Sequence, residues 1–305
     1  MRVFVTGASG HIGSALVPEL LDAGHEVVGL ARSDESAAAL AAAGADVRRG
    51  GLDDLDGLGE AAATADGVVH LAFKHEDMRA GDFAGAVAAD LRAIETFGDA
   101  LAGTGKPLVG TSGTLLLARA GLGRTGTEAD TLDAGPRVDA ENAVVALAGR
   151  GVRSSIVRLP PTVHSSLDHH GFVPALIAIA REKGVAAYVG DGCSRWPAGH
   201  TLDAAHLYRL ALEAAPAGAR LHAVGDEGVP FGEIAAVIGR HLNLPVVSIP
   251  PEQADAHFGY LGPLVSLDNP TSSLQTQELL GWKPMQPGLI EDLDQGHYFG
   301  ASSPS

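Results

Sequence analysis

Residues 2–30 read RVFVTGASGHIGSALVPELLDAGHEVVGL. A β-rich run leads into Gly7, Gly10 and Gly13, after which an amphipathic stretch leads into a second β-rich run. In a turn between a strand and a helix, Gly7 permits the tight bend, Gly10 lets the backbone approach a diphosphate, and Gly13 allows close packing of helix on strand. The helix amino terminus then directs free amides at the phosphates. The stretch therefore predicts a dinucleotide-binding unit at the start of the chain.

Short β-rich runs alternate with longer helical runs through the first half of the chain. We expect strands at 2–6, 26–30, 45–49, 67–72, 107–111 and 152–158, and helices at 11–23, 33–43, 54–64, 83–101 and 137–150. This alternation is typical of βαβ units with right-handed crossovers, so the predicted fold class is α/β with a Rossmann-type doubly wound parallel sheet.

The alternation ends after Pro160 and Pro161. The following segment predicts helices at 171–183, 203–215 and 231–241, separated by short strands at 186–189, 220–224 and 246–248. We therefore expect a dinucleotide-binding domain of residues 1–160 plus about 203–224. A smaller, discontinuous substrate-binding lobe would contain about 161–202 and 225–305.

Composition limits the classes of partner and location. The chain has 305 residues, which predicts about two domains, and its 21 Lys and Arg against 37 Asp and Glu give a formal charge of −16. An acidic surface repels nucleic acid and anionic membranes, so neither is an expected partner. The single cysteine, Cys193, excludes an internal disulfide. Without a signal-peptide pattern the expected location is cytoplasmic, and the tail at 301–305 is expected to fray.

The end of the second strand bears on the choice of cofactor. An acidic residue usually reads the ribose hydroxyls about 20 residues after the glycine motif. Here the positions are Ala31, Arg32 and Ser33, and a guanidinium with a hydroxyl suits a 2′-phosphate. The sequence therefore favours NADP(H), with NAD(H) as the alternative, unless Arg32 is only a solvated residue at a strand end.

The segment TGASGHIGSALVPELL at 6–21 resembles the opening of the short-chain dehydrogenase/reductase superfamily, in its extended, NAD-dependent epimerase/dehydratase branch. Further similarity lies in LD at 52–53, HLA at 70–72, TSGT at 111–114, RLPPTV at 158–163, and GDG at 190–192 followed by HTLD at 200–203. The resemblance implies cofactor contacts from Gly7, Ser9, Gly10, His11, Ile12, Gly13, Arg32, Ser33, Leu52, Asp53, Leu71, Ala72, Thr111, Pro160 and Val163.

The family's catalytic pair, Tyr-x-x-x-Lys on the helix after the fifth strand, has no counterpart here. The tyrosines are Tyr188, Tyr208, Tyr260 and Tyr298, and none has a lysine four residues later. The expected helix instead carries Arg137 and Glu141, which would share one helix face. They are either a functional replacement, with Arg137 as an oxyanion donor and Glu141 toward ribose, or a surface ion pair worth about 0.3–0.5 kcal/mol.

Other residues are candidates for the proton relay. Ser112 resembles the family's hydroxyl that bonds the reacting oxygen, unless it bonds only local backbone. His164 follows the Pro-Pro loop and titrates near neutral pH, and its alternative role is a buried structural histidine. Lys74 and His75 follow the fourth strand, at the edge where substrate would lie.

The resemblance also implies a substrate pocket. Arg195 would clamp an anion there and Trp196 would form a flat wall, with Thr114 and His200 also near the substrate. The alternative for Trp196 is a packing anchor. Asp168, His169 and His170 are adjacent but specify no third ligand, so we expect no metal site.

The favoured function is an NAD(P)(H)-dependent oxidoreductase acting on a small carbonyl or alcohol with a non-standard proton relay. One alternative is an epimerase, dehydratase or isomerase that retains its cofactor. Another is a dinucleotide-binding sensor without catalysis. Because extended family members commonly pair through the helices predicted at 83–101 and 137–150, we also expect a homodimer.

Overall fold

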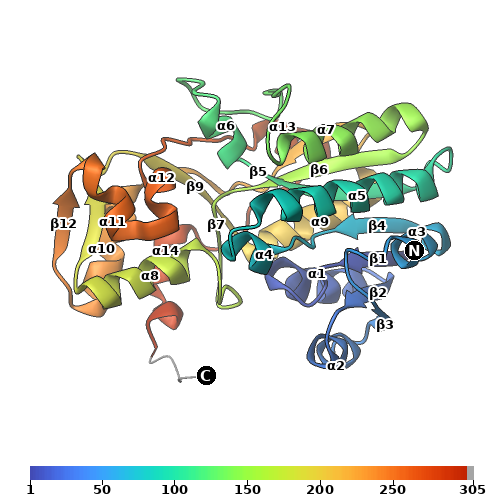
Figure 1. Ribbon diagram of the computed structural model, residues 1–305, viewed down its shortest axis with the longest axis horizontal. Helices are drawn as coiled ribbons and strands as arrows, with labels where there is room; N and C mark the ends of the chain where they lie inside the picture. The colour runs from blue at the N-terminus through green and yellow to red at the C-terminus, as the bar shows by residue number, and fades with distance from the viewer. Residues whose placement is uncertain (301–305) are drawn as a thin grey trace.

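The computed structural model describes residues 1–300, and the tail expected to fray lies outside them. Its larger lobe is built on a parallel seven-stranded sheet in the order β10-β6-β5-β4-β1-β2-β3 (Figure 1). These strands are β1 (Arg2–Thr6), β2 (Glu26–Ala31), β3 (Asp46–Arg49), β4 (Gly67–His70), β5 (Pro107–Gly113), β6 (Arg153–Leu159) and β10 (Ala219–His222). The strand order reverses between β1 and β4, where doubly wound sheets bind ligands. The predicted α/β fold class is confirmed.

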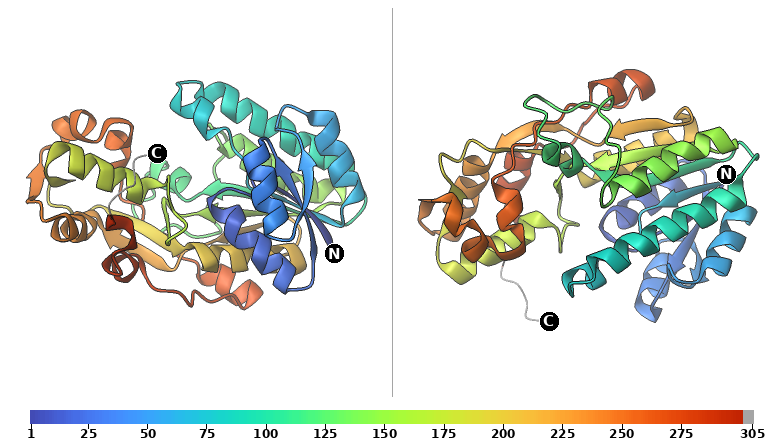
Figure 2. Two further views of the ribbon diagram at one scale, coloured as in Figure 1. Left: turned by 90° about the horizontal axis from the view of Figure 1, so that it is seen from below. Right: turned by 45° about the horizontal axis from the view of Figure 1, so that its top comes forward.

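Helices cover both faces of this sheet (Figures 1 and 2). One face packs against α1 (His11–Asp22) and α9 (Thr201–Ala214), and α2 (Asp34–Ala42) packs against β2 and β3. The other face carries α3 (Leu55–Thr64), α5 (Phe83–Leu101) and α7 (Val138–Ala146), which contact one another in that order. The single helix predicted at 137–150 is divided, because α7 is followed by the 3-10 helix η1 (Leu147–Arg150).

The smaller lobe has its own core. It contains α8 (Phe172–Lys183), α10 (Phe231–Leu242), α11 (Ala254–Phe258), α14 (Leu289–Asp294) and the parallel pair β8 (Ala186–Val189) and β12 (Val246–Ile249). A second sheet, in the order β11-β9-β7, connects it to the larger lobe through β7 (Thr162–His164), β9 (Arg195–His200) and β11 (Asp226–Pro230). The sequence did not predict these three strands: β7 has only three residues, and β9 and β11 each contain proline and glycine.

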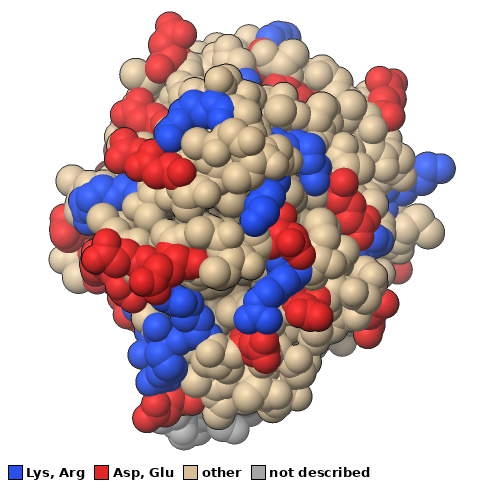
Figure 3. Space-filling model, turned by 90° about the vertical axis from the view of Figure 1, so that its right-hand side faces the viewer, with Lys and Arg blue, Asp and Glu red and all other residues tan. Residues whose placement is uncertain are grey.

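The remaining elements are short. They are α4 (His75–Arg79), α6 (Leu115–Arg119), α12 (Gly262–Val265), α13 (Leu274–Leu280), η2 (Pro251–Gln253), η3 (Gly259–Leu261) and η4 (His297–Phe299). Within residues 1–300, no helix is long and apolar enough to cross a membrane. Figure 3 shows that acidic and basic side chains are interspersed on the face that holds the N-terminus, so the negative charge is not concentrated there.

Candidate functional site

The loop between β1 and α1 forms a cradle of bare backbone. Gly7 has a φ of 66°, and a Cβ on it would lie 2.8 Å from the backbone nitrogen of Ala72. A Cβ on Gly13 would lie 2.2 Å from the carbonyl oxygen of Gly7. The helix α1 begins after Gly10 without any side-chain cap, so its first amides are left for another partner. Uncapped amides at a helix amino terminus fit the diphosphate of a dinucleotide.

Asp53, which is predicted to contact the cofactor, forms ion pairs with two neighbouring cations. Asp53 is exposed, and its carboxylate lies 2.7 Å from Nζ of Lys74 and 3.8 Å from a guanidinium nitrogen of Arg92. The hydrogen bond from Asp53 raises the pKa of Lys74. Leu52 lies buried in the core. Lys74 is therefore held by Asp53, and its contact with substrate stays a prediction.

Arg32 and Arg49 lie at the carboxyl ends of β2 and β3, respectively. The Arg32 side chain is 69% exposed, and one of its guanidinium nitrogens lies 3.5 Å from a carboxylate oxygen of Glu76. Arg49 ends β3 opposite Ala31; it donates to the carbonyl oxygen of Ser33 and, at 2.7 Å, to a carboxylate oxygen of Asp34. The sequence analysis missed Arg49. Its signal was a basic residue at the end of the neighbouring strand.

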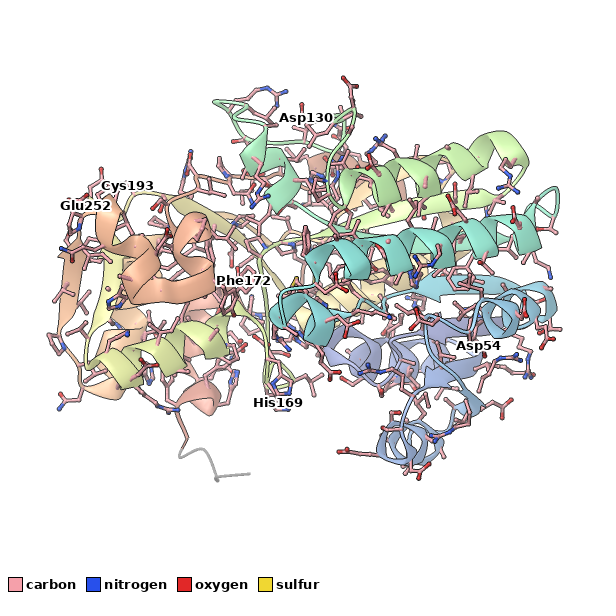
Figure 4. All side chains as sticks on the ribbon, in the orientation of Figure 1. Asp54, Asp130, His169, Phe172, Cys193 and Glu252 are labelled. Atoms are coloured by element: carbon pink, nitrogen blue, oxygen red, sulfur yellow. The ribbon has the colours of Figure 1, made fainter. Side chains whose placement is uncertain are left out.

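The two lobes are joined beside the glycine loop by hydrogen bonds. His11, the first residue of α1, lies 2.7 Å through Nε2 from the hydroxyl of Thr201, which also accepts from Ser165 at 2.8 Å. Burial and the nearby His169 lower the pKa of His11 to about 4, so its ring is neutral at neutral pH. Figure 4 labels His169 in the loop at the junction of the lobes.

Arg137 is fixed at the carboxyl ends of β4 and β5. Its backbone has a φ of 70°, which few non-glycine residues adopt. Its guanidinium donates to a carboxylate oxygen of Asp90 at 2.9 Å and to the carbonyl oxygen of Thr111 at 3.1 Å. The carbon Cζ lies 4.2 Å from the centre of the Phe73 ring, in a cation–π contact. Three interactions, with Asp90, Thr111 and Phe73, therefore determine where this positive charge lies.

Asp90 extends this contact into a buried chain. Its second oxygen lies 3.1 Å from Nε2 of His70, whose Nδ1 lies 2.6 Å from the hydroxyl of Thr6. Asp90 is 3% exposed and His70 is 2% exposed. The sequence analysis overlooked Asp90, although it stands on the apolar face of α5 between Ala86 and Ala93. A lone carboxylate on such a face signals a buried cationic partner.

The loop between β1 and α1 lies in a part of the chain that matches a known family. A family model described as "NAD dependent epimerase/dehydratase family" matches residues 3–92. An uncharacterized protein of Schizosaccharomyces pombe is 50% identical over 98% of this chain and 100% of its own length. One of Saccharomyces cerevisiae is 44% identical over 96% of this chain and 98% of its own. This chain belongs to the NAD-dependent epimerase/dehydratase family.

Solved structures in the family share the fold. The dTDP-glucose 4,6-dehydratase DesIV of Streptomyces venezuelae, crystallised with NAD, has a TM-score of 0.75 at 20% identity, with 96% of each chain covered. The UDP-glucose 4-epimerase of Thermus thermophilus in complex with NAD has a TM-score of 0.70 at 22% identity, over 99% of this chain and 100% of that one.

The predicted role of Glu141 needs correction. Arg137 precedes α7 and lies outside helical geometry, so it does not share a helix face with Glu141. Glu141 is 3% exposed and accepts from Arg158 at 3.0 Å and Arg220 at 2.9 Å, so it neither faces ribose nor forms a surface pair. Ser112 is the register partner of Arg158, and its buried hydroxyl helps to lower the pKa of Glu141, so its bond to a reacting oxygen stays a prediction.

Burial alone would raise the pKa of Glu141. The hydrogen bonds and positive charge of Arg158 outweigh it, so the net shift of the pKa is downward. This carboxylate is therefore a structural anion that neutralises two arginines inside the protein.

His164 is also enclosed. It is 0% exposed, its Nδ1 lies 2.9 Å from a carboxylate oxygen of Asp292, and its ring packs against His200 at 5.4 Å. The prediction that His164 donates the proton to substrate is at odds with this burial. His200 accepts from the backbone nitrogen of Leu202 and begins α9, so its role is a helix cap rather than a pocket wall.

The remaining predicted substrate residues are occupied by structural contacts. Trp196 is 0% exposed, with ring centres 5.8 Å from Phe172 and 5.1 Å from Phe231, so it is the packing anchor of the smaller lobe. Thr114 is 0% exposed and accepts from Asn269. Arg195 makes two hydrogen bonds to Asp268, at 2.9 and 2.7 Å. Among residues 1–300, no three His, Cys, Asp or Glu are arranged to hold a metal ion.

Proposed function

We propose that this chain is an NADP(H)-linked oxidoreductase that interconverts a small carbonyl compound and its alcohol. The observation that carries the proposal is the guanidinium of Arg137, which is held at the carboxyl ends of β4 and β5, the sheet edge at which doubly wound folds bind ligands. The bare cradle of Gly7, Gly10 and Gly13 fits a dinucleotide diphosphate, and the solved relatives named above were crystallised with NAD. A bound nicotinamide supplies the site that gives or receives hydride.

Arg137 would act through its charge. A guanidinium keeps its protons at any working pH, so Arg137 cannot serve as the acid. Asp90 and Thr111 engage two of its nitrogens, and the side chain remains 21% exposed. A positive charge held in a fixed place stabilises an alkoxide without reorganising during the reaction. Ser112, His164 and Glu141 have no part in this version of the mechanism.

Removing the Arg137 charge should slow the reaction and spare cofactor binding. In Arg137→Met, we expect kcat for NADPH-dependent reduction of a panel of aldehydes and ketones to fall by about 10²–10³-fold. Calorimetry should give an unchanged Kd for NADP(H). Arg150→Met is the matched control, because Arg150 is exposed and pairs with Asp99 away from the groove. Wild-type turnover in Arg137→Met would contradict this role.

Cofactor choice should depend on Arg32. We expect the wild type to bind NADP(H) more tightly than NAD(H), and Arg32→Ala to lose about 10-fold or more in NADP(H) affinity, since a hydrogen bond between charged groups contributes ~1.5–3 kcal/mol. Arg49→Ala should cost less, because its guanidinium already binds Ser33 and Asp34. Calorimetry with both cofactors measures this, with Arg150→Ala as control. Equal or tighter wild-type binding of NAD(H) would refute the preference.

The second candidate function is an epimerase or dehydratase that retains its cofactor. It is favoured by the family match and by the dehydratase and epimerase among the solved relatives. The purified protein would then carry bound nicotinamide, visible by its absorbance, and would turn over no aldehyde or ketone with added NADPH. Bound cofactor with no turnover of any substrate class would instead indicate the sensor. The expected homodimer and cytoplasmic location stay predictions.

A further inference from the structure

The short helix α4 packs against α5 and faces the smaller lobe (Figure 1). None of its residues is buried, and Arg79 reaches across to the carbonyl oxygen of His170 at 3.5 Å. His75 opens the helix, and its ring centre lies 5.1 Å from that of Phe73. Because Phe73 also lies 4.2 Å from Cζ of Arg137, His75 and the fixed guanidinium contact the same aromatic ring.

Other proton carriers near Arg137 are already engaged. Both ring nitrogens of His70 are used within the buried chain. Lys74 is held in two ion pairs. Tyr208 is fully buried, and burial raises the pKa of its hydroxyl far above the usual range. His75 differs, because it is not fully buried and, within residues 1–300, no hydrogen bond engages either of its ring nitrogens.

We propose that His75 exchanges the proton with the reacting oxygen, while Arg137 stabilises the negative charge on that oxygen. This inference rests on the proposed function, because the interconversion of an alcohol and a carbonyl requires a proton carrier there. Three charged groups act on the His75 ring: Arg137 from the residue before α7, Arg79 from α4 itself, and Asp90 from α5.

The charge around His75 suits this role. Burial of the ring, Arg137 and Arg79 lower the pKa of His75, and Asp90 opposes them. The imidazole is therefore neutral at neutral pH and ready to accept a proton from an alcohol. The same lowered pKa makes the protonated ring a stronger donor in the reverse direction.

The step balances in both directions. In oxidation, the C–H bond of the alcohol breaks and its hydrogen leaves with both electrons as hydride to the oxidised nicotinamide. The hydroxyl proton passes to a free ring nitrogen of His75, and the electron pair of the O–H bond forms the second carbon–oxygen bond. In reduction, protonated His75 returns this proton to the oxygen as hydride adds to the carbonyl carbon.

A nuclear magnetic resonance titration tests the geometry without any substrate. The His75 ring signal is assigned by its loss in His75→Gln. We expect Arg137→Met to raise the pKa of His75, because a neighbouring positive charge is removed. The control His170→Gln changes an exposed histidine in the other lobe and should leave the pKa of His75 unchanged. If the pKa of His75 is the same in Arg137→Met as in the wild type, the proposal is overturned.

Kinetics test the role itself. With an aldehyde or ketone that the wild type reduces, His75→Gln should lower kcat by about 10²-fold or more and flatten its pH dependence below the ordinary histidine pKa of 6.5, with KM little changed. His170→Gln should behave as wild type. If His75→Gln matches the wild type at every pH, His75 is not the proton carrier and the proposed function stands. If the wild type reduces nothing, both proposals fall.

Discussion

Gly13→Ala is expected to weaken cofactor binding by about 10–100-fold and to destabilise the larger lobe. The new Cβ would lie 2.2 Å from the carbonyl oxygen of Gly7 and 2.5 Å from the backbone of Ala8. Backbone atoms cannot rotate away as a side chain can, so α1 must move off the loop. Overpacking of this kind costs about 1–3 kcal/mol or more, and each 1.4 kcal/mol is about tenfold in affinity.

Calorimetry with NADP(H) and thermal unfolding would measure both consequences of Gly13→Ala. Gly149→Ala is the matched control, because a Cβ there meets no atom within 4 Å. Gly10→Ala should fall between the two, since its Cβ would lie 3.2 Å from the carbonyl oxygen of Gly7. If Gly13→Ala binds cofactor as the wild type does, the cradle is not the diphosphate site.

Glu141→Gln is expected to lower the free energy of unfolding by about 3–5 kcal/mol, although the side chain keeps its size. Glu141 lies inside the protein between Arg158 and Arg220, and Arg158 is only 1% exposed. Loss of the carboxylate charge would leave two guanidinium groups buried without an anion. Urea unfolding measures the change, and Glu95→Gln on the exposed face of α5 should have almost no effect.

The effect of Glu141→Gln should also depend on pH. The pKa of Glu141 in the folded protein is below its ordinary value of 4.5, because Arg158 outweighs the effect of burial. A lowered carboxyl pKa stabilises the fold fully above the unfolded pKa, and this contribution is lost as pH falls through the folded pKa. The stability gap between wild type and variant should therefore be constant near neutral pH and shrink below about pH 4.5. A gap that persists at lower pH would contradict the buried ion pair.

Arg137 and Glu141 illustrate how much the site depends on one backbone angle. Had residue 137 been helical, the two side chains would lie one above the other. The φ of 70° at Arg137 instead turns its guanidinium to Asp90 and Thr111, while Glu141 faces β6. Arg137 is therefore held at the carboxyl ends of β4 and β5, whereas Glu141 lies in the interior.

The sequence by itself determined the features that rest on neighbouring residues. The glycine spacing fixed the β1–α1 cradle, and the alternation of short β-rich and helical runs fixed the parallel sheet. The exposed Arg32 at the end of β2 also followed from position alone. These are local signals, because each needs only the periodicity or the backbone freedom of a short segment.

Only the tertiary structure decided which polar side chains contact one another. Asp90 meets Arg137 across 47 residues, and His164 meets Asp292 across 128. A charged side chain that leaves water must find a partner, and that partner is chosen by packing of whole elements rather than by sequence distance. Strand register likewise turned Ser112 toward Arg158. For this reason the glycine loop between β1 and α1 could be predicted from the sequence, whereas the contacts of Arg137 required the folded chain.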